Sequence, residues 1–139
     1  MARVALFGTM LTNWREGVAS HLRANGHVPV DNTDPRWPDA ATAEEILPLL
    51  RQDHEFMRTA DIVLWHHDAG TPGDTARFEL GIPALFGRWT VVHVDPGTPS
   101  REYMRALCLL YPSRLHWADS MEDALTFIQR LAEALSSRE

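Results

Sequence analysis

The residue best suited to covalent chemistry is Glu79, which stands in the segment Ala-Arg-Phe-Glu-Leu-Gly over residues 76–81. The segment follows an apolar run and predicts the first turns of a helix, where the helix dipole favours an ionised carboxylate. An ionised, positioned carboxylate can attack an anomeric carbon and hold a covalent glycosyl intermediate. Gly81 has no side chain and would let a substrate approach closely. The plainer interpretation is an ordinary glutamate at the start of a helix.

Four aspartates surround the apolar run that precedes Glu79. Asp53 comes before it, Asp61 opens it, and Asp68 and Asp74 follow it. Acid and base work on a sugar requires one carboxylate that stays charged and another that can hold a proton. Acidic residues are also common in loops after strands, so the cluster is compatible with both catalysis and simple solvation.

The triplet His66-His67-Asp68 looks like a set of metal ligands. Successive side chains of a strand point to opposite faces, so His66 and His67 cannot easily share an ion. Cys108 is the only cysteine, which excludes a thiolate metal site and an internal disulfide. We therefore expect no metal.

Two earlier loops could contact a ligand. Residues 8–15 lack the glycine-rich dinucleotide fingerprint and the P-loop lysine, but they offer Trp14 for stacking and Arg15 for an anionic group. The alternative is that Trp14 belongs to the core and that Arg15 is solvated. The second loop, residues 31–37, contains Asn, Asp and Pro, which also favour turns, and it ends in Trp37.

Short apolar runs alternate with longer amphipathic ones along the chain. The short runs lack polar alternation, which indicates strands covered on both faces. Five such units predict a parallel sheet with right-handed crossovers in the order 2-1-3-4-5, a flavodoxin-like α/β sandwich of three layers in a single domain over residues 1–139. Ligands of such sheets bind beyond the carboxyl ends of the strands. The expected strands are 4–7, 27–30, 61–65, 90–94 and 115–117, and the expected helices are 14–25, 43–59, 75–87, 100–110 and 120–135.

Composition narrows the range of partners. The chain has 139 residues and a formal net charge of −6, which disfavours a nucleic acid polymer or an anionic membrane as the main partner. No apolar run is long enough to span a membrane. The single cysteine and the absence of a signal-peptide pattern predict a cytoplasmic protein.

In combination, several short motifs resemble the nucleoside 2-deoxyribosyltransferase-like family. The resemblance covers about residues 3 to 117, and its most specific part is the Glu-Leu-Gly element after an Ala-Asp-Ile-Val-Leu strand. The matching motifs, in order, are Leu6-Phe7-Gly8-Thr9, Asn13-Trp14-Arg15, Asp31-Asn32 with the trailing Trp37, the acidic helix around Asp53, Ala60-Asp61-Ile62-Val63-Leu64 and Phe78-Glu79-Leu80-Gly81.

The resemblance implies a flavodoxin-like fold and covalent catalysis at Glu79, with Asp53 binding the sugar and orienting the nucleophile. Asp74 would stand for the acid that contacts the base. Members include transferases that exchange bases on 2-deoxyribose and hydrolases of nucleoside 5′-monophosphates, and members complete their sites with a neighbour's residues. We therefore expect a small-molecule nucleoside or nucleotide as substrate, no cofactor, and a homodimer or higher homo-oligomer. The substrate contacts would be Phe7, Gly8, Thr9, Trp14, Arg15, Asn32, Trp37 and Gly81.

Two alternatives remain open. One is a catalytically silent module of the same fold that binds a nucleotide or another ligand. The other is an NAD-type glycohydrolase, which would use the same glutamate chemistry.

The chain also departs from the family pattern. The loop at residues 70–75 lacks the run of small residues found in many members. Asp68 is a second candidate for the acid that protonates the base.

Overall fold

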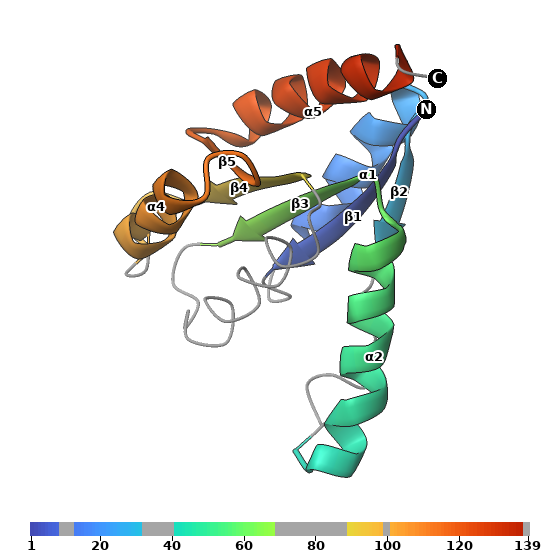
Figure 1. Cartoon of the computed structure of the whole chain (residues 1–139), viewed down its shortest axis with the longest axis vertical. Coiled ribbons are helices and arrows are strands. Elements are labelled where there is room, and N and C mark those ends of the chain that lie inside the picture. The colour runs from blue at the N-terminus through green and yellow to red at the C-terminus, as the bar shows by residue number, and fades with distance from the viewer. Residues whose placement is uncertain (9–12, 32–40, 69–88, 99–100, 138–139) are drawn as a thin grey trace.

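A computed structural model describes residues 1–8, 13–31, 41–68, 89–98 and 101–137. Five strands and four helices lie in the described parts of the chain, close to where the sequence predicts them (Figure 1). The helix expected over 75–87 lies outside the described residues. The strands are β1 (Arg3–Gly8), β2 (Val28–Asp31), β3 (Ile62–His67), β4 (Trp89–Val94) and β5 (Leu115–Ala118), and the helices are α1 (Trp14–Ala24), α2 (Ala43–Thr59), α4 (Arg101–Leu110) and α5 (Met121–Ser136).

The strands form one sheet in the order β2-β1-β3-β4-β5, and every pairing is parallel. This confirms the predicted strand order and the flavodoxin-like class of fold. The strand order reverses after β1, because β1 lies between β2 and β3. The carboxyl ends of β1 and β3 therefore stand beside each other, with Gly8 in register with His66.

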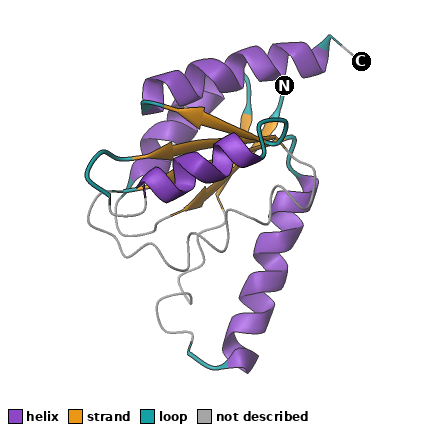
Figure 2. Cartoon of the chain, turned by 60° about the vertical axis from the view of Figure 1, so that its left-hand side comes forward, coloured by secondary structure: helices purple, strands orange, loops and turns teal. Residues whose placement is uncertain are grey.

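Two apolar cores cover the two faces of the sheet. All six residues of β3 are buried, as expected of a strand with both faces covered. Helices α1 and α5 pack on one face and helices α2 and α4 on the other (Figures 1 and 2). The first core contains Val4, Leu6, Ile62, Leu64 and Val91 from the strands. The second contains Ala5, Phe7, Val63, Trp65, Val92 and Val94.

Local signals fix the ends of the helices. Gly26, two residues past α1, has φ +80°, a conformation that glycine adopts without steric cost. Thr42 and Glu45 form a reciprocal capping box at the start of α2. The Ser120 hydroxyl accepts a hydrogen bond from the Asp123 amide, 3.0 Å away, at the start of α5.

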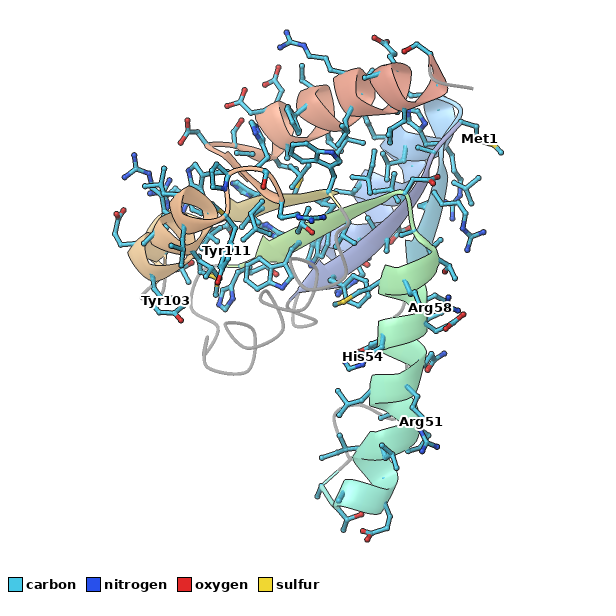
Figure 3. The ribbon with its side chains drawn as sticks, viewed as in Figure 1. Met1, Arg51, His54, Arg58, Tyr103 and Tyr111 are labelled. Atoms are coloured by element: carbon cyan, nitrogen blue, oxygen red, sulfur yellow. The ribbon has the colours of Figure 1, made fainter. Side chains whose placement is uncertain are left out.

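One outer surface is markedly apolar. Tyr103, Leu109, Leu110 and Tyr111, in and just after α4, are between 45% and 70% exposed. Figure 3 labels Tyr103 and Tyr111 at the end of the molecule where α4 lies. Among the described residues, no helix has the length and apolar character needed to cross a membrane.

Candidate functional site

The carboxyl ends of β3 and β4 carry the same short pattern, a histidine followed two residues later by an aspartate. His66 lies near the end of β3 and Asp68 follows the strand, and His93 lies near the end of β4 and Asp95 follows it. Alternation along each strand places these side chains on the face covered by α1 and α5, because Ile62, Leu64 and Val91 belong to that core. His66 and His93 are partners in the strand register, so they lie side by side.

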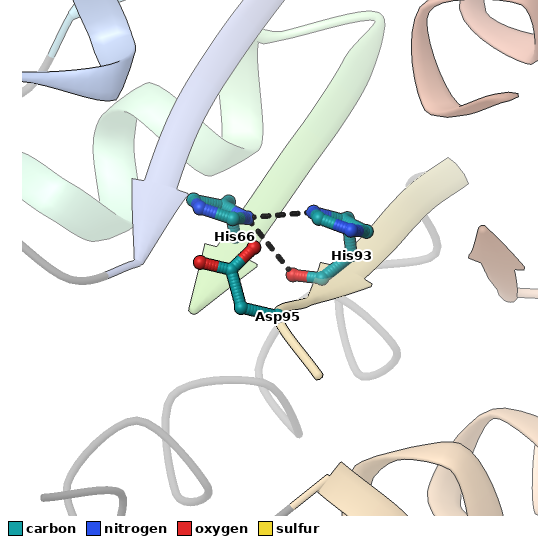
Figure 4. A group of neighbouring side chains, drawn as sticks. All are labelled: His66, His93 and Asp95. Carbon is teal, nitrogen blue, oxygen red and sulfur yellow. Dashed lines mark hydrogen bonds between the residues drawn. The ribbon is translucent and has the colours of Figure 1, made fainter. Parts of the chain in front are cut away.

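The two imidazoles and Asp68 form a continuous chain of polar contacts (Figure 4 shows the histidines). His66 Nε2 lies 2.7 Å from Asp68 Oδ1, and His66 Nδ1 lies 2.9 Å from His93 Nδ1. The two ring planes are nearly parallel, with an angle of 3° between them. His66 Nδ1 is also 3.2 Å from the backbone carbonyl oxygen of His93. Both histidines are at most 5% exposed.

The contacts constrain where the protons lie. A neutral imidazole has one N–H, and the Asp68 carboxylate requires a donor, so a neutral His66 carries its proton on Nε2 and leaves a lone pair on Nδ1. Burial lowers the pKa of His93 from its ordinary value of 6.5, and the charge of His66 lowers it further. These effects favour the neutral form of His93, whose Nδ1 can donate its proton to Nδ1 of a neutral His66.

A pocket of about 430 Å³ opens beside this cluster, between α1 and α5. Trp14 forms one wall, with its ring edge-on to the His66 ring at a centroid distance of 4.9 Å. Trp14 therefore belongs both to the rim of the core and to a ligand-accessible surface. The residues lining the pocket are Trp14, Gly17, Val18, His66, Asp68, His93, Asp95, Met121 and Leu125.

Arg15 is buried, with 6% of its surface exposed. Its Nη2 donates to the carbonyl oxygen of Gly8 at 3.2 Å, and its Nε lies 3.6 Å from an Asp31 carboxylate oxygen. The guanidinium also lies over the Trp14 ring, 4.7 Å from the centroid. Arg15 thus connects the carboxyl ends of β1 and β2 to the start of α1, and it is not the solvated residue of the alternative interpretation.

Asp53 belongs to the other face of the sheet. It is 7% exposed and shares a buried stripe of α2 with Leu49 and Met57, which are four residues away on either side. Met57 packs in the same core as Phe7. The structure therefore brings Asp53 and Phe7 to the α2 and α4 face, and it brings Trp14 to the opposite face.

The remaining predicted site residues fall outside the described parts of the chain. These residues are Thr9, Asn32, Trp37, Asp74, Glu79 and Gly81. Gly8 is described and lies against the backbone of His66.

Sequence reasoning missed His93 and Asp95. It considered His66 and His67, which do point apart, since the His67 ring lies near Trp65 on the other face at a centroid distance of 5.7 Å. The signal that was available is the repeated His-x-Asp at the ends of two expected strands that are neighbours in the predicted order. Two imidazole nitrogens and one carboxylate, from His66, His93 and Asp95, come within 4.8 Å of one another, as ligands of one cation would.

The sequence matches no protein-family model, and it matches none of the curated proteins with which it was compared. Solved structures do match. A 2-deoxyribosyltransferase from Bacillus psychrosaccharolyticus aligns with a TM-score of 0.65 at 17% identity, over 89% of this chain and 90% of the other. A CMP N-glycosidase from Clostridium botulinum aligns with a TM-score of 0.57 at 17% identity, over 91% of this chain and 97% of the other. The chain has a nucleoside deoxyribosyltransferase-like fold.

Proposed function

We propose that the protein is an N-glycosyl enzyme that cleaves or exchanges the base of a nucleoside or nucleotide. The observation that carries the proposal is the buried Asp53 on α2, in a fold shared with a 2-deoxyribosyltransferase and a CMP N-glycosidase. Asp53 lies on the same face as Phe7, one of the predicted substrate contacts.

In the proposed mechanism, Glu79 is the nucleophile. Its carboxylate oxygen forms a bond to C1′ of the sugar while the bond from C1′ to the base nitrogen breaks, and the electron pair leaves with the base. Asp53 binds the sugar and orients Glu79. Water or a second base then attacks C1′, which releases the sugar from Glu79. Whether hydrolysis or transfer dominates depends on how well the substrate site around Glu79 shields the covalent intermediate from water.

An acid must protonate the departing base, and Asp68 and Asp74 are the two candidates. Asp68 is bound to His66 Nε2 at 2.7 Å, on the face of the sheet opposite Phe7 and Met57. A carboxylate in that position is occupied as an acceptor. We therefore assign the acid to Asp74.

Base release from a substrate panel tests the proposal. Deoxynucleosides, ribonucleosides, their 5′-monophosphates and NAD are each incubated with the protein, with and without a second free base, and products are separated by liquid chromatography. We expect free or exchanged base from at least one nucleoside or nucleotide. Glu79→Gln should lower the rate by at least ~10³-fold, and Asp53→Asn should also lower it.

Glu55→Gln is the matched control, because Glu55 is an exposed α2 residue paired with Arg58. Its turnover should stay within about twofold of the unaltered protein. Near-normal turnover of Glu79→Gln would reject the mechanism. Silence towards the whole panel would reject the enzyme and favour a ligand-binding module. Release from NAD alone would favour the glycohydrolase.

A further inference from the structure

We propose that His66, His93 and Asp95 form a binding site for one divalent transition-metal ion, which Asp68 supports by orienting His66. The metal-site proposal does not depend on the proposed N-glycosyl chemistry. The site lies on the face of the sheet covered by α1 and α5, whereas Asp53 and Phe7 belong to the face covered by α2. Its ligands come from two neighbouring strands whose carboxyl ends are fixed by the sheet (Figure 4).

The spacing of the donor atoms suits one ion. The Nδ1 atoms of His66 and His93 are 2.9 Å apart, and one imidazole nitrogen of each and a carboxylate oxygen of Asp95 lie within 4.8 Å of one another. Nitrogen ligands lie about 2.0–2.1 Å from zinc, so two nitrogens at this separation subtend about 90° at a shared ion. That angle fits cis positions of an octahedral ion, and a small rotation of either ring would open it towards the tetrahedral angle. Two imidazoles and a carboxylate are a common ligand set for such ions.

In the neutral state, Nδ1 of His66 carries an electron pair that faces His93. With the proton of a neutral His66 on Nε2, donated to Asp68, its Nδ1 presents a lone pair to the space beside β4. The carbonyl oxygen of His93 faces the same atom at 3.2 Å. A divalent cation would replace the proton shared by the two Nδ1 atoms, with the His93 proton moved to Nε2, and the two imidazoles and the Asp95 carboxylate would bind it together.

Asp68 has the position of a supporting carboxylate. In many metal sites, a ligating histidine donates its other N–H to a carboxylate, which fixes the tautomer and makes the ligating nitrogen more basic. The contact of 2.7 Å from His66 Nε2 to Asp68 has this form, and both side chains are at most 10% exposed. The His66 ring is also held by Trp14, so the ligand is positioned before any ion binds.

The pocket gives the ion access to a small ligand. It has a volume of about 430 Å³ and is lined by His66, His93 and Asp95 together with Trp14. Three protein ligands leave coordination positions open, which is the arrangement of metal sites that bind water or a substrate. An ion here would therefore have open coordination positions beside the pocket, and an oxygen-bearing ligand would complete the shell.

Metal binding by the full-length chain tests the proposal. After treatment with a chelator and its removal, the protein is titrated with Zn²⁺ and with Co²⁺ by calorimetry, and the Co²⁺ complex is also followed by its visible absorption. We expect one ion per chain. His66→Gln and His93→Gln should each weaken binding at least ~100-fold, and Asp68→Asn should weaken it ~10–100-fold. His21→Gln is the matched control, because His21 is an exposed histidine of α1, and it should change affinity less than about twofold.

A second measurement uses the unaltered protein and so does not depend on variants that fold. The chain has seven histidines, and Co²⁺ should shift the imidazole NMR signals of His66 and His93 strongly while those of His21 and His54 stay in place. No binding at millimolar Zn²⁺ or Co²⁺ would overturn the proposal. Equal shifts of exposed histidines, or equal affinity in the His21 and His66 variants, would also overturn it. Loss of metal binding leaves the base-release test on Glu79 unaffected, so the two proposals can fail separately.

Discussion

Gly8, the last residue of β1, lies so close to His66 in β3 that a Cβ on Gly8 would stand 1.8 Å from the carbonyl oxygen of His66. Gly8 has φ +126°, which L side chains rarely adopt. Its own carbonyl oxygen accepts a hydrogen bond from Arg15. The chain therefore leaves the sheet at a point where only a hydrogen atom fits, directly beside the His66 cluster.

Gly8→Ala should lower the free energy of unfolding by at least ~2 kcal/mol, because both the backbone conformation and the close approach exclude a methyl group. Urea unfolding followed by circular dichroism measures the change. Gly17→Ala is the control, since nothing lies within 4 Å of a Cβ at that helical position and alanine favours helix. We expect Gly17→Ala to be neutral or to stabilise by up to ~1 kcal/mol. Equal stability of the two variants would contradict the close approach at Gly8.

The strands and their order follow from the sequence because their signals are local or topological. The six residues of β3 are apolar or histidine and all buried, and α2 begins at a capping box that the chain encodes within four residues. Alternating strands and helices then leave few right-handed parallel arrangements. These features can be predicted without knowing which side chains are in contact in the folded protein.

The candidate site was less predictable because it depends on tertiary pairing. His66 and His93 are 27 residues apart and meet only through the register of β3 and β4. The burial of Arg15 likewise depends on the carbonyl of Gly8 and the carboxylate of Asp31, which the fold brings together from β1 and β2. The placement of Asp53 opposite Trp14 follows from which helix covers which face of the sheet. The position of Glu79 stays a prediction.

The thiol of Cys108 should be unreactive in the folded protein. Burial raises the pKa of Cys108 to about 12, so little nucleophilic thiolate exists near neutral pH. Native protein at pH ~8 should react with iodoacetamide at least ~100-fold more slowly than protein unfolded in urea. Mass spectrometry of quenched samples gives both rates. Similar rates in the two states would show that α4 does not protect this side chain.

We expect the chain to self-associate through the exposed apolar surface of α4. Leu109 and Leu110 are 70% and 66% exposed, which is costly unless another surface covers them. Sedimentation at micromolar concentration should show a species of at least twice the mass of one chain. Leu109→Asp with Leu110→Asp should shift it to the single-chain mass.

Leu47→Asp is the control for this surface, because Leu47 is also exposed, at 47%, but lies on α2. It should leave the assembly intact. Sedimentation of the unaltered protein at the mass of one chain would contradict the predicted self-association.

His116 should make the fold less stable in mild acid. The ring lies parallel to Phe127 at a centroid distance of 3.5 Å, and burial lowers its pKa from 6.5. Below pH 6.5, His116 binds a proton readily in the unfolded chain but less readily in the folded chain. The free energy of unfolding therefore falls as the pH drops from 6.5 towards the pKa of His116 in the folded protein. Both His116→Gln and His116→Phe should lose less stability than the unaltered protein between about pH 7 and about pH 5. Parallel stability profiles would exclude His116 as a source of the acid sensitivity.

The proposed nucleophile predicts a covalent sugar ester on Glu79 and retention of configuration at C1′. Two successive displacements at one carbon restore its original configuration, whereas a single attack by water inverts it. A 2-fluoro-2-deoxy nucleoside should slow breakdown of the ester, because fluorine destabilises the oxocarbenium-like transition state. Intact mass spectrometry should then show one sugar added per chain, and peptide mapping should place it on Glu79. The same experiment with Glu79→Gln should show no adduct, while Glu55→Gln should label normally. An adduct on Asp74, or inversion without an adduct in an active enzyme, would show that Glu79 is not the nucleophile.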